Sequence, residues 1–215
     1  MAIRILIADD HAIVRDGLKM ILETDMDMAV VGNAADGNAA ISQAEALQPD
    51  VILMDISMPA LNGIEACRTI TQKLPGTRVI MLSMHNTHEH VFRSIRAGAK
   101  GYLLKESLGS EVITAIQTVM NGKSFLGAGI ELPSRVSIRD ILTIPKGPLD
   151  SLSDRERQIL QHVVEGRTSA EIATILDLSA KSVETYRSRL MKKLNITNIP
   201  TLVKFALQQG ITPTS

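Results

Sequence analysis

The sequence has no tryptophan, one cysteine and few aromatic residues, and it lacks any long apolar run. Purely apolar stretches such as residues 51–54 and 79–82 span four residues, whereas a membrane-spanning helix needs about 20. The lone Cys67 excludes an intramolecular disulfide and fits the reducing cytoplasm. The N-terminal residues soon meet acidic side chains and do not match a secretion signal. We therefore expect a cytoplasmic protein with an aliphatic core and no membrane partner.

Neither sign of charge dominates, because 23 basic residues balance 23 acidic ones. The balance is uneven along the chain, since residues 179–194 hold five basic residues and a single acidic one. With 215 residues, 45% of them hydrophobic, the chain has a globular composition and room for two modest domains. An anionic partner such as DNA is expected to meet this basic segment rather than the whole surface.

The first 122 residues alternate between short apolar runs and stretches in which apolar residues have helical spacing. The apolar runs predict five strands, at 3–8, 28–31, 51–54, 79–84 and 101–104. Unbroken apolar strands are typical of parallel sheets that helices cover on both faces. The pattern therefore predicts an α/β domain over residues 1–122, with a (βα)5 doubly wound parallel sheet of the flavodoxin-like type.

Residues 123–149 break this rhythm, because glycine and proline recur there and prevent a long helix. The apolar residues near 134–142 are compatible with one short helix. Two alternatives stay open for this segment, a flexible tether and a partly helical linker.

Residues 150–215 show helical spacing throughout and predict an all-α domain of four helices. Capping-box patterns at residues 153–156 and 168–171 mark the starts of its first two helices. After the second helix and a three-residue turn, Ser179 can cap a basic third helix. Two short helices joined by a tight turn, the second of them basic, are typical of a DNA-binding helix-turn-helix.

Polar side chains stand at the ends of four of the predicted strands: Asp9 and Asp10, then Asp55, Ser83 and Lys105. These ends meet at the edge of a doubly wound sheet where ligands bind. Three close carboxylates repel one another, which favours a divalent cation with oxygen ligands, Mg²⁺. Asp55 stands alone at the central strand end and is the candidate nucleophile for an aspartyl-phosphate. An aspartate-nucleophile phosphatase would need a second Asp two residues on, where this sequence has Ser57.

These motifs carry a family resemblance. Asp9-Asp10-His11, Asp55 with the following Ile56-Ser57-Met58-Pro59, Ser83 and Gly101-Tyr102-Leu103-Leu104-Lys105 resemble a two-component receiver domain. Residues 152–156 and 181–185 resemble a LuxR-type helix-turn-helix, and the combination resembles the NarL/FixJ response regulators.

The resemblance implies that a sensor histidine kinase phosphorylates Asp55 and that the chain is a regulator of transcription rather than an enzyme. It implies Mg²⁺ ligation by Asp9, Asp10, Asp55 and the backbone carbonyl of Ser57. Lys105 would pair with the phosphoryl oxygens, and Ser83 and Tyr102 would move on phosphorylation. It also implies a homodimer on DNA or when phosphorylated.

Three residues near this site carry further expectations. Glu106 stands where many receivers have proline, so we expect a trans bond after Lys105. His11 is expected to cap the first helix. His85, two residues beyond Ser83, could tune the attack of water on an acyl phosphate.

The face of the basic helix opposite its apolar stripe offers Lys181, Ser182, Glu184, Thr185, Ser188, Arg189 and Lys192, and these residues together with Arg187 and Lys193 are the candidate DNA-binding residues. We expect Lys181, Glu184, Thr185 and Ser188 to meet bases, and Arg187, Arg189, Lys192 and Lys193 to meet phosphates.

Glu184 has two interpretations. Its carboxylate either accepts from cytosine N4 or pairs with Arg187 or Ser188 on its own helix, and the spacing favours the intrahelical pair. For the whole chain, the alternative function is a DNA-binding regulator that never takes phosphate and uses its receiver-like domain for protein contacts.

Overall fold

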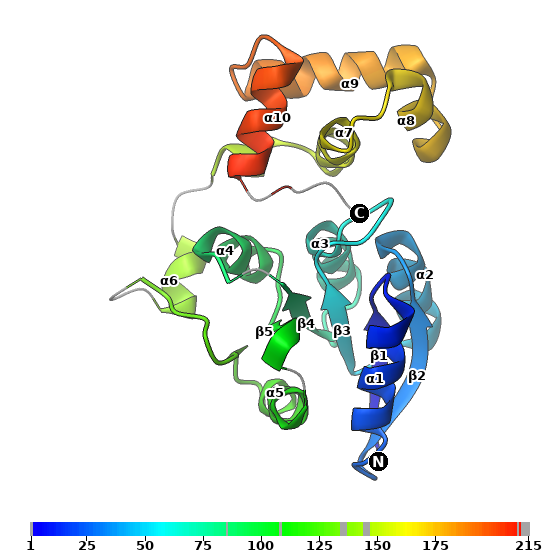
Figure 1. Cartoon of the computed structure of the whole chain (residues 1–215), viewed down its shortest axis with the longest axis vertical. Coiled ribbons are helices and arrows are strands. Elements are labelled where there is room, and N and C mark those ends of the chain that lie inside the picture. The colour runs from blue at the N-terminus through cyan, green and yellow to red at the C-terminus, as the bar shows by residue number, and fades with distance from the viewer. Residues whose placement is uncertain are drawn as a thin grey trace. The chain divides into compact units, whose positions relative to one another are not determined.

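The structure is a computed structural model that describes residues 2–84, 86–107, 109–133, 137–143, 147–209 and 211. The chain divides into two compact units, Met1–Thr143 and Ile144–Ser215 (Figure 1). The first unit contains the strands, and the second contains only helices among its described residues. Within the described ranges, no helix has the length and apolar character needed to span a bilayer.

The first unit contains a parallel sheet with the strand order β2-β1-β3-β4-β5-β6. The strands are β1 (Ile3–Ala8), β2 (Met28–Ala34), β3 (Val51–Asp55), β4 (Arg78–Ser83), β5 (Gly101–Leu104) and β6 (Phe125–Leu126). Between the first five strands and after the fifth lie α1 (Ala12–Leu22), α2 (Gly37–Leu47), α3 (Gly63–Lys73), α4 (His88–Arg96) and α5 (Ser110–Met120). The predicted α/β fold with a doubly wound parallel sheet is confirmed.

Alternate residues of each strand pack on opposite faces of this sheet. Leu53 of β3 belongs to the core beneath α1 and α5, whereas its neighbours Ile52 and Met54 belong to the core beneath α2, α3 and α4. Helices thus cover both faces (Figure 1). This double coverage is why the strands are apolar without alternation.

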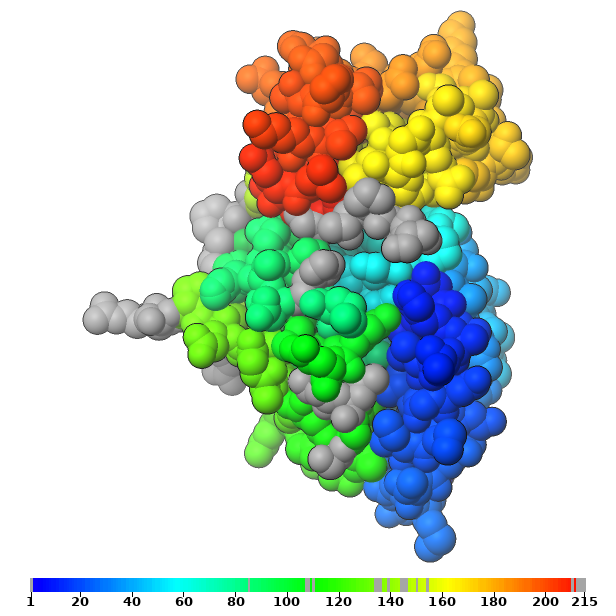
Figure 2. Space-filling model, viewed as in Figure 1, coloured from blue at the N-terminus to red at the C-terminus, as the bar shows by residue number. Residues whose placement is uncertain are grey.

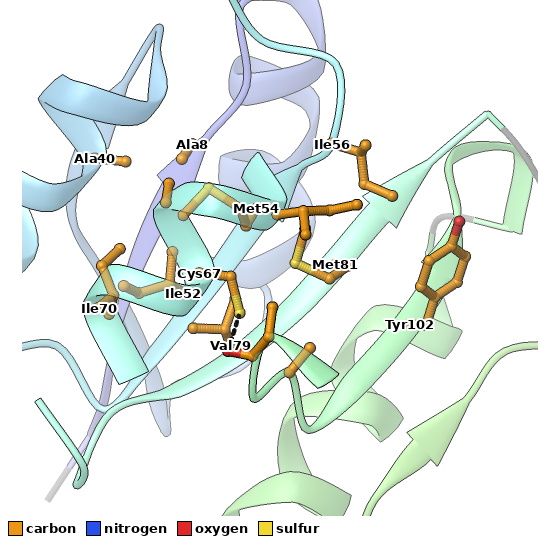
Figure 3. Packing of buried hydrophobic residues seen from close by; sticks show 14 of the residues in the cluster. Ala8, Ala40, Ile52, Met54, Ile56, Cys67, Ile70, Val79, Met81 and Tyr102 are labelled. Atoms are coloured by element: carbon orange, nitrogen blue, oxygen red, sulfur yellow. Dashed lines mark hydrogen bonds between the residues drawn. The ribbon is translucent and has the colours of Figure 1, made fainter. Parts of the chain in front are cut away.

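Cys67 lies in the core beneath α2, α3 and α4, which Figure 3 shows from close by. Its Sγ donates to the carbonyl oxygen of Ala97 at 3.7 Å. Burial raises the pKa of the thiol to about 12. Because the thiolate is the reactive form, Cys67 serves packing rather than chemistry.

The segment expected as a linker is largely built onto the first unit. β6 pairs with β5 as a sixth parallel strand, and the Gly127 N–H donates to the Tyr102 carbonyl oxygen at 2.9 Å. The apolar side chains of Leu126, Ile130 and Leu132 pack against the core, which explains why this stretch is not a free tether. The first unit therefore runs to Thr143, beyond the expected boundary at residue 122.

This segment ends in a short helix, α6 (Ile138–Thr143), that packs on α4. Figure 2 shows the atoms of α6 against those of α4 on the surface of the first unit. Ile141 is fully buried, and Arg96 Nε donates to its carbonyl oxygen at 3.3 Å. The expectation of a short helix here holds for this range, while residues 134–136 lie outside the described residues.

The second unit begins with a 3₁₀ turn at Pro148–Ser151 and continues with α7 (Asp154–Val164), α8 (Ser169–Leu176), α9 (Ala180–Lys193) and α10 (Ile199–Gln208). Both predicted capping boxes are present, at Ser153 and at Thr168. The Ser179 side chain caps α9 by accepting from the Ser182 N–H. One apolar cluster joins all four helices and confirms the predicted helical domain.

Candidate functional site

Charged side chains converge at the carboxyl edge of the sheet in the first unit. Asp9 and Asp10 follow β1, Asp55 ends β3, and Lys105 follows β5. β1 and β3 are neighbours in the strand order although β2 separates them in sequence. This is the topological switch point at which open α/β sheets bind ligands.

Lys105 bridges two of the carboxylates. Its Nζ lies 2.8 Å from Asp9 Oδ2 and 3.0 Å from Asp55 Oδ2. Asp9 is fully buried and Asp55 is 2% exposed, so the interaction takes place in a poorly solvated environment. Removal of Lys105 would leave both buried carboxylates without a compensating cation, whereas loss of one carboxylate leaves Lys105 paired with the other.

The cluster shifts the pKa values of its members. Burial raises the pKa of Asp55, and the neighbouring Asp9 charge adds to this, while Lys105 and the Ser57 backbone N–H act in the opposite direction. Burial acts to lower the pKa of Lys105, but the two carboxylates outweigh it and raise that pKa. Lys105 is thus held as an ammonium. A further cation at the site would stabilise the ionised form of Asp55.

His11 occupies the N-cap position of α1, but its imidazole makes no capping hydrogen bond. Its Nδ1 instead lies 2.7 Å from Asp10 Oδ1 and 3.2 Å from Asp9 Oδ1. His11 thus caps α1 as expected, but through its backbone: its carbonyl oxygen accepts from the Val14 and Arg15 N–H groups, while its ring faces the two carboxylates. Sequence adjacency to the acidic pair was the signal for this contact.

Arg15 is a neighbour of the site that the sequence reasoning missed. Its guanidinium donates to the Asp9 carbonyl oxygen at 2.6 Å. It follows His11 by four residues, which places both on one face of α1. That spacing could have identified it.

The acidic group fits a divalent metal ion. One ligand atom each from Asp9, Asp10, His11 and Asp55 lies within 4.8 Å of all the others. Asp9 Oδ2, Asp10 Oδ1 and Asp55 Oδ2 are buried atoms; Lys105 Nζ pairs with the first and the third, and His11 Nδ1 lies beside the second. One ammonium does not balance three carboxylates, and carboxylate oxygens are the ligands that a hard cation such as Mg²⁺ prefers.

The loop after β3 lies close against Asp55. Asn62 caps α3 by accepting from the Glu65 N–H, and the Gly63 N–H donates to the Ile56 carbonyl oxygen at 2.9 Å. A Cβ atom at Gly63 would lie 1.8 Å from the Asp55 carbonyl oxygen, so only glycine fits there. The Ser57 N–H contacts the Asp55 carboxylate, which places this residue beside the acid as expected.

Ser83 and Tyr102 form a pair beside the acidic cluster. Ser83 ends β4 and is 2% exposed, and Tyr102 on β5 is fully buried (Figure 3). Burial raises the pKa of Tyr102 to about 12, a hydrogen bond with Ser83 opposes this, and the Asp55 charge adds to it. His85 lies outside the described residues. Among those residues no peptide bond is cis, as expected where Glu106 replaces proline.

In the second unit, α9 presents the expected polar face. Val183 and Leu190 are buried in the helical core. Lys181, Glu184, Thr185, Ser188, Arg189, Lys192 and Lys193 are exposed, whereas Ser182 and Arg187 are partly buried. The Thr185 hydroxyl donates to the Lys181 carbonyl oxygen at 2.9 Å. Arg189 lies over the Tyr186 ring at 5.9 Å.

Two basic residues of α9 are used inside the domain. Arg187 donates to Ser169 Oγ at 3.0 Å, which ties α9 to the start of α8. Lys193 Nζ donates to Glu156 Oε2 at 2.7 Å and to the Ser151 carbonyl oxygen at 3.1 Å. The Glu156 pairing argues against the expected phosphate contact of Lys193, because its ammonium already neutralises a buried carboxylate.

Replacement of Lys193 by Met is expected to destabilise the helical unit by about 1–2 kcal/mol. Burial acts to raise the pKa of Glu156, but hydrogen bonds from Lys193 and Ser153 outweigh it and lower that pKa. The stabilisation is therefore present above the usual glutamate pKa and is lost as the pH falls through the folded-state value. Calorimetry of the full chain at neutral and acidic pH measures both effects. Lys204→Met, an exposed site on α10, is the control, and an unchanged Lys193→Met transition would contradict the assignment.

The expected intrahelical partner of Glu184 is not found. No hydrogen bond or ion pair in the part of the chain that the structure describes joins its carboxylate to Arg187 or Ser188. The guanidinium of Arg187 is drawn toward Ser169 instead, which explains why the favoured interpretation was wrong.

Two family models match the two units. The model of the response regulator receiver domain matches residues 5–117, and the model of the bacterial regulatory proteins of the luxR family matches residues 150–206. A buried acidic site on a receiver fold and a helix-turn-helix thus occur together in one chain. The chain belongs to the two-component response regulators with a LuxR-type DNA-binding domain.

Individual relatives span the whole chain. The transcriptional regulatory protein MctR of Rhizobium johnstonii is 39% identical over 209 residues, which are 97% of this chain and 95% of that protein. The oxygen regulatory protein NreC of Staphylococcus carnosus is 38% identical over 217 residues, covering 97% and 98%. The solved RcsB–DNA complex has a TM-score of 0.56 at 27% identity and covers 97% of this chain and 99% of that chain.

Proposed function

We propose that this response regulator is controlled by Mg²⁺-dependent phosphorylation of Asp55 and that the phosphorylated form binds DNA more tightly. The observation that carries the proposal is the bridge from Lys105 to Asp9 and Asp55, within a group of three carboxylates that one ammonium does not neutralise. Such a group is equipped for phosphoryl transfer to a carboxylate.

Each residue has a role in this proposal. Asp9, Asp10, Asp55 and the Ser57 carbonyl would hold Mg²⁺, which when bound neutralises carboxylate charge and the charge of the phosphoryl oxygens. A carboxylate oxygen of Asp55 attacks the phosphorus of a phosphohistidine on a sensor histidine kinase, and the P–N bond breaks. Lys105 then pairs with a phosphoryl oxygen in place of the Asp55 carboxylate.

Ser83 and Tyr102 are the proposed switch. Their hydrogen bond joins the end of β4 to β5, which pairs with β6. A phosphoryl group on Asp55 offers Ser83 a stronger acceptor than the Tyr102 hydroxyl. Movement of Ser83 toward it would free Tyr102 to change rotamer, a small event of the kind that biases a two-state element.

The proposed DNA contacts lie on the exposed face of α9. We assign Lys181, Glu184, Thr185 and Ser188 to base edges, and Arg187, Arg189 and Lys192 to phosphates. Arg187 can serve both Ser169 and a phosphate, because a guanidinium has five donor hydrogens. Two copies of the chain would occupy two half-sites of an operator in the cytoplasm.

The test is sequencing of genomic fragments that the full chain retains, with and without a small phosphodonor such as acetyl phosphate. The proposal expects the same fragments in both samples, with an affinity about 5- to 150-fold higher in the presence of the phosphodonor. Equal affinities in the two samples would instead support a regulator that works without phosphorylation.

A further inference from the structure

Glu184 is the acidic exception on the polar face of α9. It lies beyond the first turn that Ser179 caps, so the helix dipole, whose effect fades within that turn, does not account for it. It is exposed, and the described residues offer its carboxylate neither a hydrogen bond nor an ion pair. No interaction among the described residues therefore uses the Glu184 charge to stabilise the fold.

The position of Glu184 is one that meets DNA. It lies in the N-terminal half of α9, the part of a recognition helix that reaches base edges. It lines the same surface hollow as Ser188 and Lys192, so its carboxylate shares the face assigned to DNA. An anion there is repelled by phosphates, and a favourable contact with a base would compensate for that repulsion.

The hydrogen-bonding groups that the bases present in the major groove determine which base the Glu184 carboxylate can contact. A carboxylate only accepts hydrogen bonds. Guanine offers N7 and O6 and thymine offers O4, all of which are acceptors that repel it. Adenine has a donor at N6, but its acceptor N7 lies alongside. Cytosine offers the N4 amino donor with no neighbouring acceptor on that base, so it is the base that a carboxylate fits best.

We propose that Glu184 determines specificity for one C·G base pair in each half-site by accepting a hydrogen bond from cytosine N4. The inference rests on the DNA-binding role of α9 proposed above and adds the identity of one base that it reads. Glu184 is thus a specificity-determining residue, whereas the basic residues around it supply affinity.

The first experiment selects binding sites from a randomised duplex pool with the full-length protein treated with acetyl phosphate. The wild type is expected to enrich a C·G pair that Glu184→Gln replaces by A·T, because a glutamine amide pairs with adenine N6 and N7. Asp177→Asn is the matched control, since it removes the same charge at an exposed left-handed residue where asparagine is tolerated. It should enrich the wild-type sequence.

The second experiment alters the DNA and leaves the protein unchanged. N4-methylation of the selected cytosine removes the groove-facing N–H, because the remaining one pairs with guanine. Wild-type affinity should then fall about 5- to 150-fold, whereas 5-methylcytosine should cost far less. This arm stays informative if Glu184→Gln fails to fold.

Two results would overturn the inference and leave DNA binding intact: the same enriched base for wild type and Glu184→Gln, or an affinity that N4-methylation does not change. Failure of the wild type to enrich any sequence would overturn the DNA-binding role itself, and the inference with it.

Discussion

Asp55→Asn is expected to abolish phosphoryl uptake completely. The carboxylate oxygen of Asp55 is the proposed nucleophile, and an amide at the same place cannot replace it. The variant should stay folded, because burial raises the pKa of Asp55 and the substitution removes a poorly solvated charge without changing the shape. Intact mass measured after incubation with acetyl phosphate and Mg²⁺ gives the result directly.

The control for this experiment is Asp16→Asn. Asp16 lies exposed on α1, so its replacement removes one negative charge from the same unit without touching the acidic cluster. It should take up phosphate as the wild type does. A mass increase that persists in Asp55→Asn, or that disappears in both variants, would refute Asp55 as the acceptor.

DNA affinity is expected to fall steeply with salt. If two copies make about 6–10 phosphate contacts, the plot of log K against log salt should have a slope of about −5 to −9. Affinity would then drop roughly a thousandfold or more between about 50 and 200 mM salt. Fluorescence anisotropy of a labelled duplex, titrated at several salt concentrations, measures the slope.

Substitutions on α9 sharpen this measurement. Lys192→Ala should flatten the slope by about one for each copy bound, with a similar loss on all sequences, because a phosphate contact carries no sequence information. Lys204→Ala removes an exposed charge from α10 and should leave the slope unchanged. A slope near zero for the wild type would show that α9 does not bind DNA through phosphates.

The sequence predicted the fold wherever local rules and tertiary structure agree. Unbroken apolar runs such as residues 51–54 had to be buried on both faces, and the strand-end acids had to share an edge once the sheet was parallel. The helical unit was equally predictable, because capping boxes mark the starts of α7 and α8 and depend only on residues close in sequence.

The features that escaped prediction depend on contacts distant in sequence. β6 has two residues and exists because β5 leaves an edge for it to pair with. Lys193 looks like a phosphate ligand on a helical wheel, but its true partner Glu156 is 37 residues away. The ring of His11 is the exception, because its partners Asp9 and Asp10 adjoin it in sequence.

The two tyrosines of this chain divide between its two units, and tryptophan is absent. Tyr102 is buried and bonded to Ser83, whereas Tyr186 lies beside Arg189 on α9. Ultraviolet light near the tyrosine absorption band therefore excites one natural chromophore in each half. Replacing either tyrosine by phenylalanine would leave the other as a label-free optical reporter of its own unit. One variant would then report on phosphorylation of the first unit, and the other on DNA binding by the second.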